Sequence, residues 1–195
     1  MRIVLLSAVG CCALLGVAAA EEPRRQLGPH EHGHAYLNIA IDGNQVVMEL
    51  DVPGVDIIGS EVKAETPEAK AAEARGSAAL EKTTELFRLS DAAACKVVMA
   101  KAMVEVDNAE ATAATPAAGG GKPAPAAEAK TGHSDFQARY DLTCASPEKI
   151  TALQLDYFQA FPNAQKVTVQ VASAKGQGQF ETSRANPRVD LSGLK

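Results

Sequence analysis

Apolar and polar side chains alternate along two short stretches near the start of the chain. Residues 35–42 read AYLNIAID, with the leucine and both isoleucines on one parity. Residues 45–52, QVVMELDV, repeat the alternation after the turn sequence Asp42-Gly43-Asn44. A period of two is that of a half-buried strand. The pattern therefore predicts a hairpin, which ends at Pro53-Gly54.

A helix is predicted to begin after Thr66. Thr66 supplies an N-cap side chain, Pro67 stands at the first helical position, and Glu68 adds an early carboxylate. An alanine-rich stretch follows and runs to about Phe87. We expect one helix over this stretch, with Leu80 and Phe87 facing the core and a weak point at Gly76.

The rest of the chain carries shorter apolar runs. Their patterns predict strands over 94–106, 135–144, 167–171 and 178–182, a brief alternation at 153–155, and one helical turn over 157–162 that ends at proline. Antiparallel β hairpins that form a sheet, together with one main helix, make the expected fold class α+β.

The segment 107–132 differs in composition from its surroundings. It consists largely of Ala, Pro, Gly, Thr, Glu and Lys. Such a sequence buries too little apolar surface to offset the entropy of ordering, so we expect a disordered insert. The expected organisation is a signal peptide at 1–20, a flexible N-terminus at 21–29, a single α+β domain formed by 30–106 and 133–184, and a C-terminal tail at 185–195.

The first twenty residues have the features of a secretory signal peptide. Arg2 precedes an apolar run that ends in three alanines, and the run is too short to span a membrane. Cleavage near Ala20 would export the chain without a transmembrane segment; lipoprotein processing at Cys11 is the alternative. Loss of Arg2 changes the formal net charge from −5 to −6. An acidic chain without a basic stripe is not expected to bind nucleic acid.

Cleavage near Ala20 removes two cysteines and leaves Cys95 and Cys144. In an oxidising compartment such a pair is most simply one disulfide, which would join the two flanks of the insert. A cross-link that closes a loop of about 50 residues contributes roughly 4 kcal/mol on the chain-entropy model. The alternative is a pair of thiolate metal ligands.

Three of the four histidines lie in the stretch PHEHGH at residues 29–34. His30, Glu31 and His34 satisfy the H-E-x-x-H pattern of zinc proteases, in which a helix brings both histidines to one face and the glutamate acts as general base. Pro29 and Gly33 disfavour that helix, and alternation with period two follows directly. We therefore expect no catalytic residues and no enzyme activity.

A strand extended backward from residue 35 gives the histidines another role. With period two, His30, His32 and His34 all lie on the polar face, and neutral imidazoles in this spacing suit Zn²⁺, or Cu²⁺ and Ni²⁺. His133 enters the 135–144 strand on its polar parity. A two-residue hairpin turn would bring Asp51 or its neighbour Pro53 opposite His34, which makes Asp51 a candidate ligand or imidazole acceptor. In the alternative, these histidines are solvated residues of a polar terminus.

Four stretches carry a resemblance to a known family: HEHGHAYLNIAIDGNQVVMELDVPGVDIIGSE at 30–61, LFRLSDAAACKV at 86–97, HSDFQARYDLTC at 133–144, and YFQAFPNAQKVTVQV at 157–171. They are similar to the ZrgA-like, zinc-regulated periplasmic proteins of Gram-negative bacteria. The resemblance implies zinc binding in the periplasm, for zinc acquisition, buffering, or delivery to the solute-binding protein of a zinc ABC transporter.

The resemblance also implies a set of site residues. His30, His32, His34 and His133 match family histidines, and Cys95 and Cys144 match its paired cysteines.

Two departures from the family pattern limit the expected site. The family commonly has a histidine after the glutamate of a Gly-Phe-Glu-His segment, where this chain has Gly59-Ser60-Glu61-Val62; Glu61 remains a candidate ligand. The family insert is often rich in histidine and aspartate, whereas residues 107–132 contain no histidine. We therefore expect a single site and a poor multi-metal reservoir. A non-metal interaction module of the envelope and a zinc hydrolase are the alternative functions.

Overall fold

The computed structural model describes residues 31–106 and 133–194. The predicted signal peptide, the predicted flexible N-terminus, His30 and the predicted insert at 107–132 lie outside the described residues.

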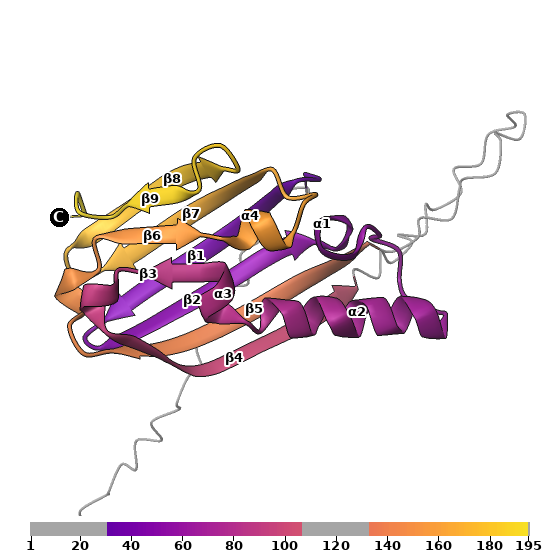
Figure 1. Cartoon of the computed structure of the whole chain (residues 1–195), viewed down its shortest axis with the longest axis horizontal. Helices are drawn as coiled ribbons and strands as arrows, with labels where there is room; N and C mark the ends of the chain where they lie inside the picture. Colours follow the sequence, from indigo (N-terminus) through magenta and orange to yellow (C-terminus); the bar gives the residue numbers. More distant parts are fainter. Residues whose placement is uncertain (1–30, 107–132, 195) are drawn as a thin grey trace, which may run out of the picture.

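Two β-sheets and several short helices make up the described chain (Figure 1). The larger sheet has the order β4–β5–β2–β1–β7–β8, formed by β1 His34–Asp42, β2 Gln45–Pro53, β4 Cys95–Val106, β5 Ser134–Cys144, β7 Lys166–Ser173 and β8 Gly176–Ser183. The smaller sheet has the order β3–β6–β9, formed by β3 Phe87–Leu89, β6 Ala152–Leu155 and β9 Arg188–Asp190. The helices are α1 Gly54–Ile58, α2 Pro67–Leu80, α3 Thr83–Leu86 and α4 Tyr157–Ala160, with 3₁₀ helices η1 Asp91–Ala93 and η2 Pro147–Lys149.

The predicted hairpins are present, but the larger sheet is mixed rather than purely antiparallel. β1 and β2 pair antiparallel around the two-residue turn that follows Asp42, and β7 and β8 form a second antiparallel hairpin. β1 and β7, far apart in the sequence, run parallel as neighbouring inner strands of the sheet. Strands dominate the described chain, so the fold agrees with the expected α+β class only loosely. Residue 189 of β9 is buried, so the folded region continues past residue 184.

The core lies between one face of the larger sheet and the elements that cover it. Leu37 and Ile39 of β1 are buried in the same cluster as Leu153 of β6 and Phe87 of β3. In Figure 1, α2 lies along the β4–β5 side of the sheet, while β3, β6 and α4 cover its central strands. The alternate residues of β1 and β2 point to the opposite face, where Glu49 pairs with Arg139 of β5 at 2.7 Å. The polar parity predicted from the sequence is thus the outer face of this sheet.

The prediction of one helix to Phe87 is wrong. α2 ends at Leu80, and Phe87 already belongs to β3. The carbonyl oxygen of Leu80 accepts a hydrogen bond from the buried Tyr140 hydroxyl at 3.0 Å. This partner comes from β5, 60 residues away, and a local pattern could not reveal it. Leu80 and Phe87 both face the core, as expected, at 0% and 3% exposure.

Gly76 has a packing role in the middle of α2. A Cβ atom at this position would lie 2.9 Å from a methyl carbon of Ile57 and 3.0 Å from the ring of Phe136. The glycine that weakens the helix therefore lets α2 approach α1 and β5 closely.

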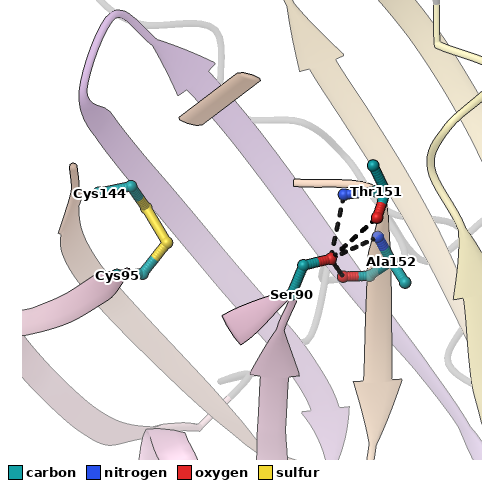
Figure 2. Close-up of a disulfide and its surroundings, with 5 residues drawn as sticks. All are labelled: Ser90, Cys95, Cys144, Thr151 and Ala152. Atoms are coloured by element: carbon teal, nitrogen blue, oxygen red, sulfur yellow. Dashed lines mark hydrogen bonds between the residues drawn. A yellow bond between two sulfur atoms is a disulfide. The ribbon is translucent and has the colours of Figure 1, made fainter. Parts of the chain in front are cut away.

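The predicted disulfide between Cys95 and Cys144 is present, where β4 and β5 meet (Figure 2). Close by, Ser90 joins the smaller sheet: its hydroxyl accepts hydrogen bonds from the backbone N–H groups of Thr151 and Ala152 at 3.1 and 3.0 Å (Figure 2). The thiolate-ligand alternative is not supported, because both sulfur atoms are used in the bond.

Within 31–106 and 133–194, none of the helices has the length and apolar character that crossing a bilayer requires.

Candidate metal site

Within the histidine-rich motif, His32 and Gly33 form a turn that precedes β1. Gly33 has φ of +82°, a conformation that glycine adopts readily, and β1 begins only at His34. The prediction that the strand continues backward through His32 is therefore wrong. The same geometry lacks the helix that the zinc-protease pattern needs, since the residues from 32 to 33 form a turn and His34 starts a strand.

Gly33 is fixed on both sides. Its carbonyl oxygen accepts hydrogen bonds from the backbone N–H groups of Gln165 and Lys166 at 2.9 and 2.8 Å. Its own N–H donates to Oδ1 of Asp56 in α1 at 2.8 Å. A Cβ at Gly33 would lie 3.1 Å from the Gln165 side chain. The turn is thus held against both α1 and the start of β7.

His34 is part of the sheet. Its Nε2 lies 2.8 Å from Oγ1 of Thr168 on β7, and its Nδ1 lies 3.4 Å from the Glu31 carboxylate. The residue is only 7% exposed, and its ring packs against that of Tyr36. Burial lowers the pKa of His34 below its ordinary value, against an opposing contribution from Glu31. The neutral imidazole is therefore favoured, and both of its nitrogens have partners.

Glu61 connects the other two described histidines. Its Oε2 lies 2.7 Å from Nε2 of His32, and its Oε1 lies 3.3 Å from Nδ1 of His133. One imidazole therefore lies at each oxygen of a single carboxylate. The side chains of His32 and His133 are 62% and 63% exposed, and the side chain of Glu61 is 26% exposed. The cluster is accessible from solvent.

The chain reaches Glu61 through α1 and a left-handed glycine. Gly59, at φ of +74°, ends α1, and its N–H donates to the carbonyl of Val55 at 3.0 Å. The carbonyl of Glu61 then accepts from the N–H of Ser134 at 2.7 Å, and Val62 forms an isolated antiparallel bridge with His133. These backbone contacts bring Glu61 beside His133 although the two are far apart in the sequence.

Asp56 is a residue of this region that the sequence reasoning did not identify. It is 2% exposed, and besides its bond to Gly33 its Oδ2 is buried with no hydrogen-bond partner in the described chain. Burial raises the pKa of Asp56, while its bond to Gly33 and the proximity of His32 act in the opposite direction. The sequence feature that points to Asp56 is its place among the apolar residues Val55, Ile57 and Ile58. A buried carboxyl group in such a run needs a hydrogen-bond partner.

The remaining predicted residues lie apart from this cluster or outside the described chain. Asp51 lies on the outer face of the larger sheet, opposite Tyr36 of β1 and Gln137 of β5, so the hairpin register does not set it opposite His34. His30 is not among the described residues. The disulfide lies at the Cys144 end of β5, whereas His133 precedes the other end of that strand.

The two imidazoles and the carboxylate of this cluster are ligand types that suit a divalent cation such as Zn²⁺. Imidazole nitrogen and carboxylate oxygen are ordinary zinc ligands. Across residues 31–106 and 133–194, however, no three His, Cys, Asp or Glu side chains converge as a ready metal-binding group. His32 and His133 instead form hydrogen bonds or ion pairs with Glu61. Both ring nitrogens therefore contact the same carboxylate, one at each of its oxygens.

Comparison with known proteins agrees with this chemistry. The model of a family described as "ZrgA family zinc uptake protein" matches residues 29–191. A search of curated proteins found no match.

Proposed function

The chain belongs to the ZrgA family of zinc uptake proteins, and we propose that it is a periplasmic zinc-binding protein that buffers zinc or delivers it to an uptake system. The observation that carries this proposal is the position of Glu61 between His32 and His133. Zinc is the cargo in this proposal, and no catalytic step is assigned to the protein.

The proposed ligands are Nε2 of His32, Nδ1 of His133 and the carboxylate of Glu61. Zinc would replace the two contacts that now join these groups, since each contact uses an atom that a metal ion would need. His30, two residues before His32, is the proposed fourth ligand. His34 is not included, because zinc binding at its Nε2 would break a buried hydrogen bond to Thr168.

Exposure of the site favours transfer of zinc over a structural role. Structural zinc sites are closed and contribute to folding directly. Here the two imidazoles are mostly exposed, while a continuous apolar core and a disulfide stabilise the fold. An accessible site on a prefolded domain can receive zinc and release it to a partner.

The cellular setting is also part of the proposal. The predicted signal peptide and the disulfide are consistent with an oxidising compartment outside the cytoplasm, and the family's role in zinc uptake makes the solute-binding protein of a zinc ABC transporter the proposed partner. Imidazole and carboxylate ligands also bind Cu²⁺ or Ni²⁺, so the test includes competition between these ions and Zn²⁺.

Isothermal titration of the exported chain, residues 21–195, tests the proposal. We expect about one Zn²⁺ per chain at neutral pH. Each of the single changes His32→Ala, His133→Ala and Glu61→Gln should lower zinc affinity by about tenfold to a hundredfold or more. Glu85→Gln is the matched control, because Glu85 is an exposed carboxylate paired with Lys82. Absence of zinc binding, or equal binding by the triple variant, would overturn the proposal. Competition with Cu²⁺ and Ni²⁺ identifies the preferred cargo.

A non-metal interaction module is the second candidate, and edge strand β4 is the feature that favours it. Val98 and Met103 on this strand are 68% and 56% exposed. The His32→Ala/His133→Ala double variant changes only exposed side chains and separates the two candidates: an interaction module keeps its function in the cell, whereas a zinc carrier loses it.

A further inference from the structure

Asp56 contacts the backbone of the turn that carries His32. Its Oδ1 accepts the hydrogen bond from Gly33, the residue that follows His32, across 23 positions of sequence. This bond joins α1, which leads into Glu61, to the turn on which His32 stands. One buried side chain therefore connects the two segments that carry the proposed ligands His32 and Glu61.

The orientation of His32 depends on this turn. The His32 side chain is 62% exposed, so little packing fixes its ring, and the backbone at Gly33 sets the direction from which it approaches Glu61. Two hydrogen bonds from the start of β7 hold the carbonyl side of Gly33, and the bond to Asp56 holds its N–H side. Loss of the Asp56 bond would free the peptide between His32 and Gly33 to rotate.

The placement of Asp56 is costly for stability, which argues for a role beyond packing. The residue is 2% exposed, and its second oxygen is buried without a hydrogen-bond partner in the described chain. A buried polar group that is left without a hydrogen bond lowers the stability of the fold. Residues that violate a packing rule in this way are expected at functional sites. Both His32 and Glu61 interact electrostatically with this carboxyl group.

We propose that Asp56 is a positioning residue for zinc: its hydrogen bond to the Gly33 N–H holds the turn so that His32 meets Glu61. The inference rests on the proposed zinc function and assigns no metal contact to Asp56. Positioning depends on Oδ1, which accepts the hydrogen bond from Gly33. Oδ2 makes no hydrogen bond in the described chain, so a substitution there breaks none.

Two substitutions separate the hydrogen bond from the rest of the side chain. Asp56→Asn keeps an acceptor at Oδ1, and Asp56→Ala removes it. We expect Asp56→Ala to weaken zinc binding by about tenfold to a hundredfold in titration calorimetry, and Asp56→Asn to restore an affinity close to that of the wild type. Tyr140→Phe is the control, because it removes another buried bond from side chain to backbone, at Leu80, within the core.

Amide hydrogen exchange at Gly33 gives an independent readout without metal. We expect the Gly33 N–H to exchange faster in Asp56→Ala and at the wild-type rate in Asp56→Asn. Circular dichroism establishes that each variant is folded. An Asp56→Ala variant that binds zinc as the wild type does, or an Asp56→Asn variant as weak as Asp56→Ala, overturns the inference while the proposed function stands. Absence of zinc binding by the wild type overturns the proposed function and this inference together.

Discussion

The Nε2 atom of His34 lies 2.8 Å from Oγ1 of Thr168 on the neighbouring strand β7. Both residues are buried, at 7% and 4% exposure. This histidine, which shares its parity with His32 in the sequence, therefore stabilises the parallel β1–β7 pair in the structure.

Replacement of Thr168 by valine should destabilise the fold without affecting zinc. The change keeps the side-chain shape but leaves a buried imidazole nitrogen without its partner, which costs about 1–3 kcal/mol. Urea denaturation measures the loss, and Thr143→Val, at a half-buried threonine on the same face of the sheet, should cost less. A change in zinc stoichiometry would mean that His34 belongs to the metal site.

The stability of the apo protein should fall as the pH falls through the range in which histidine titrates. Burial lowers the pKa of His34 below the value of about 6.5 that applies in the unfolded chain. The unfolded state then binds more protons than the folded state, so this contribution is complete above pH of about 6.5 and is lost as the pH falls toward the folded pKa. Urea denaturation from pH 7.5 to pH 5 measures the slope. His34→Gln should flatten it, and an unchanged slope would contradict the assignment.

Removal of the disulfide should weaken the fold and spare the site. Cys95 and Cys144 are separated by 49 residues, so the double change to serine should cost up to about 4 kcal/mol of unfolding free energy. Zinc affinity should stay at the wild-type value, because the disulfide and His133 lie at opposite ends of β5. Titration of both proteins checks this, and a loss of zinc by the folded variant would favour thiolate ligands.

A histidine at position 62 should strengthen zinc binding. Val62 is 52% exposed and forms an antiparallel bridge with His133, and directly opposed residues in such a pair have side chains on the same side. Val62→His therefore adds an imidazole beside His133 and should raise affinity by about tenfold, or about 1.4 kcal/mol. Lys63→His, one position further and on the opposite parity, is the control. Equal effects of both changes would indicate nonspecific binding by added histidine.

The sequence predicted local elements well where one face of a strand is buried. The alternation in β1 and β2 revealed both strands and their turn, because each buried residue is followed by one that faces the outer side. The end of α2 at Leu80 escaped prediction, and the carbonyl oxygen of Leu80 accepts a hydrogen bond from Tyr140 of β5, a contact that has no local signal. The parallel pairing of β1 with β7 likewise has no local signal.

The candidate site was predicted in its composition but not in its arrangement. His32, His133 and Glu61 were all expected ligands, and the structure brings them together. The expected row of three imidazoles along one strand fails at Gly33, whose positive φ turns the chain away from β1. Asp56 was missed because its partner is a backbone N–H, which no pattern of side chains can indicate.

The β4–β5 ladder closes with Val106 opposite Ser134, directly after His133. The sheet therefore fixes the two points at which segment 107–132 leaves and returns, and the pairing of the strands does not depend on the number of residues between them. A lineage could lengthen this segment or enrich it in histidine without changing the strand pairing, and every added histidine would lie between Val106 and His133 in the sequence. Storage capacity and site affinity can in this way evolve separately on one scaffold.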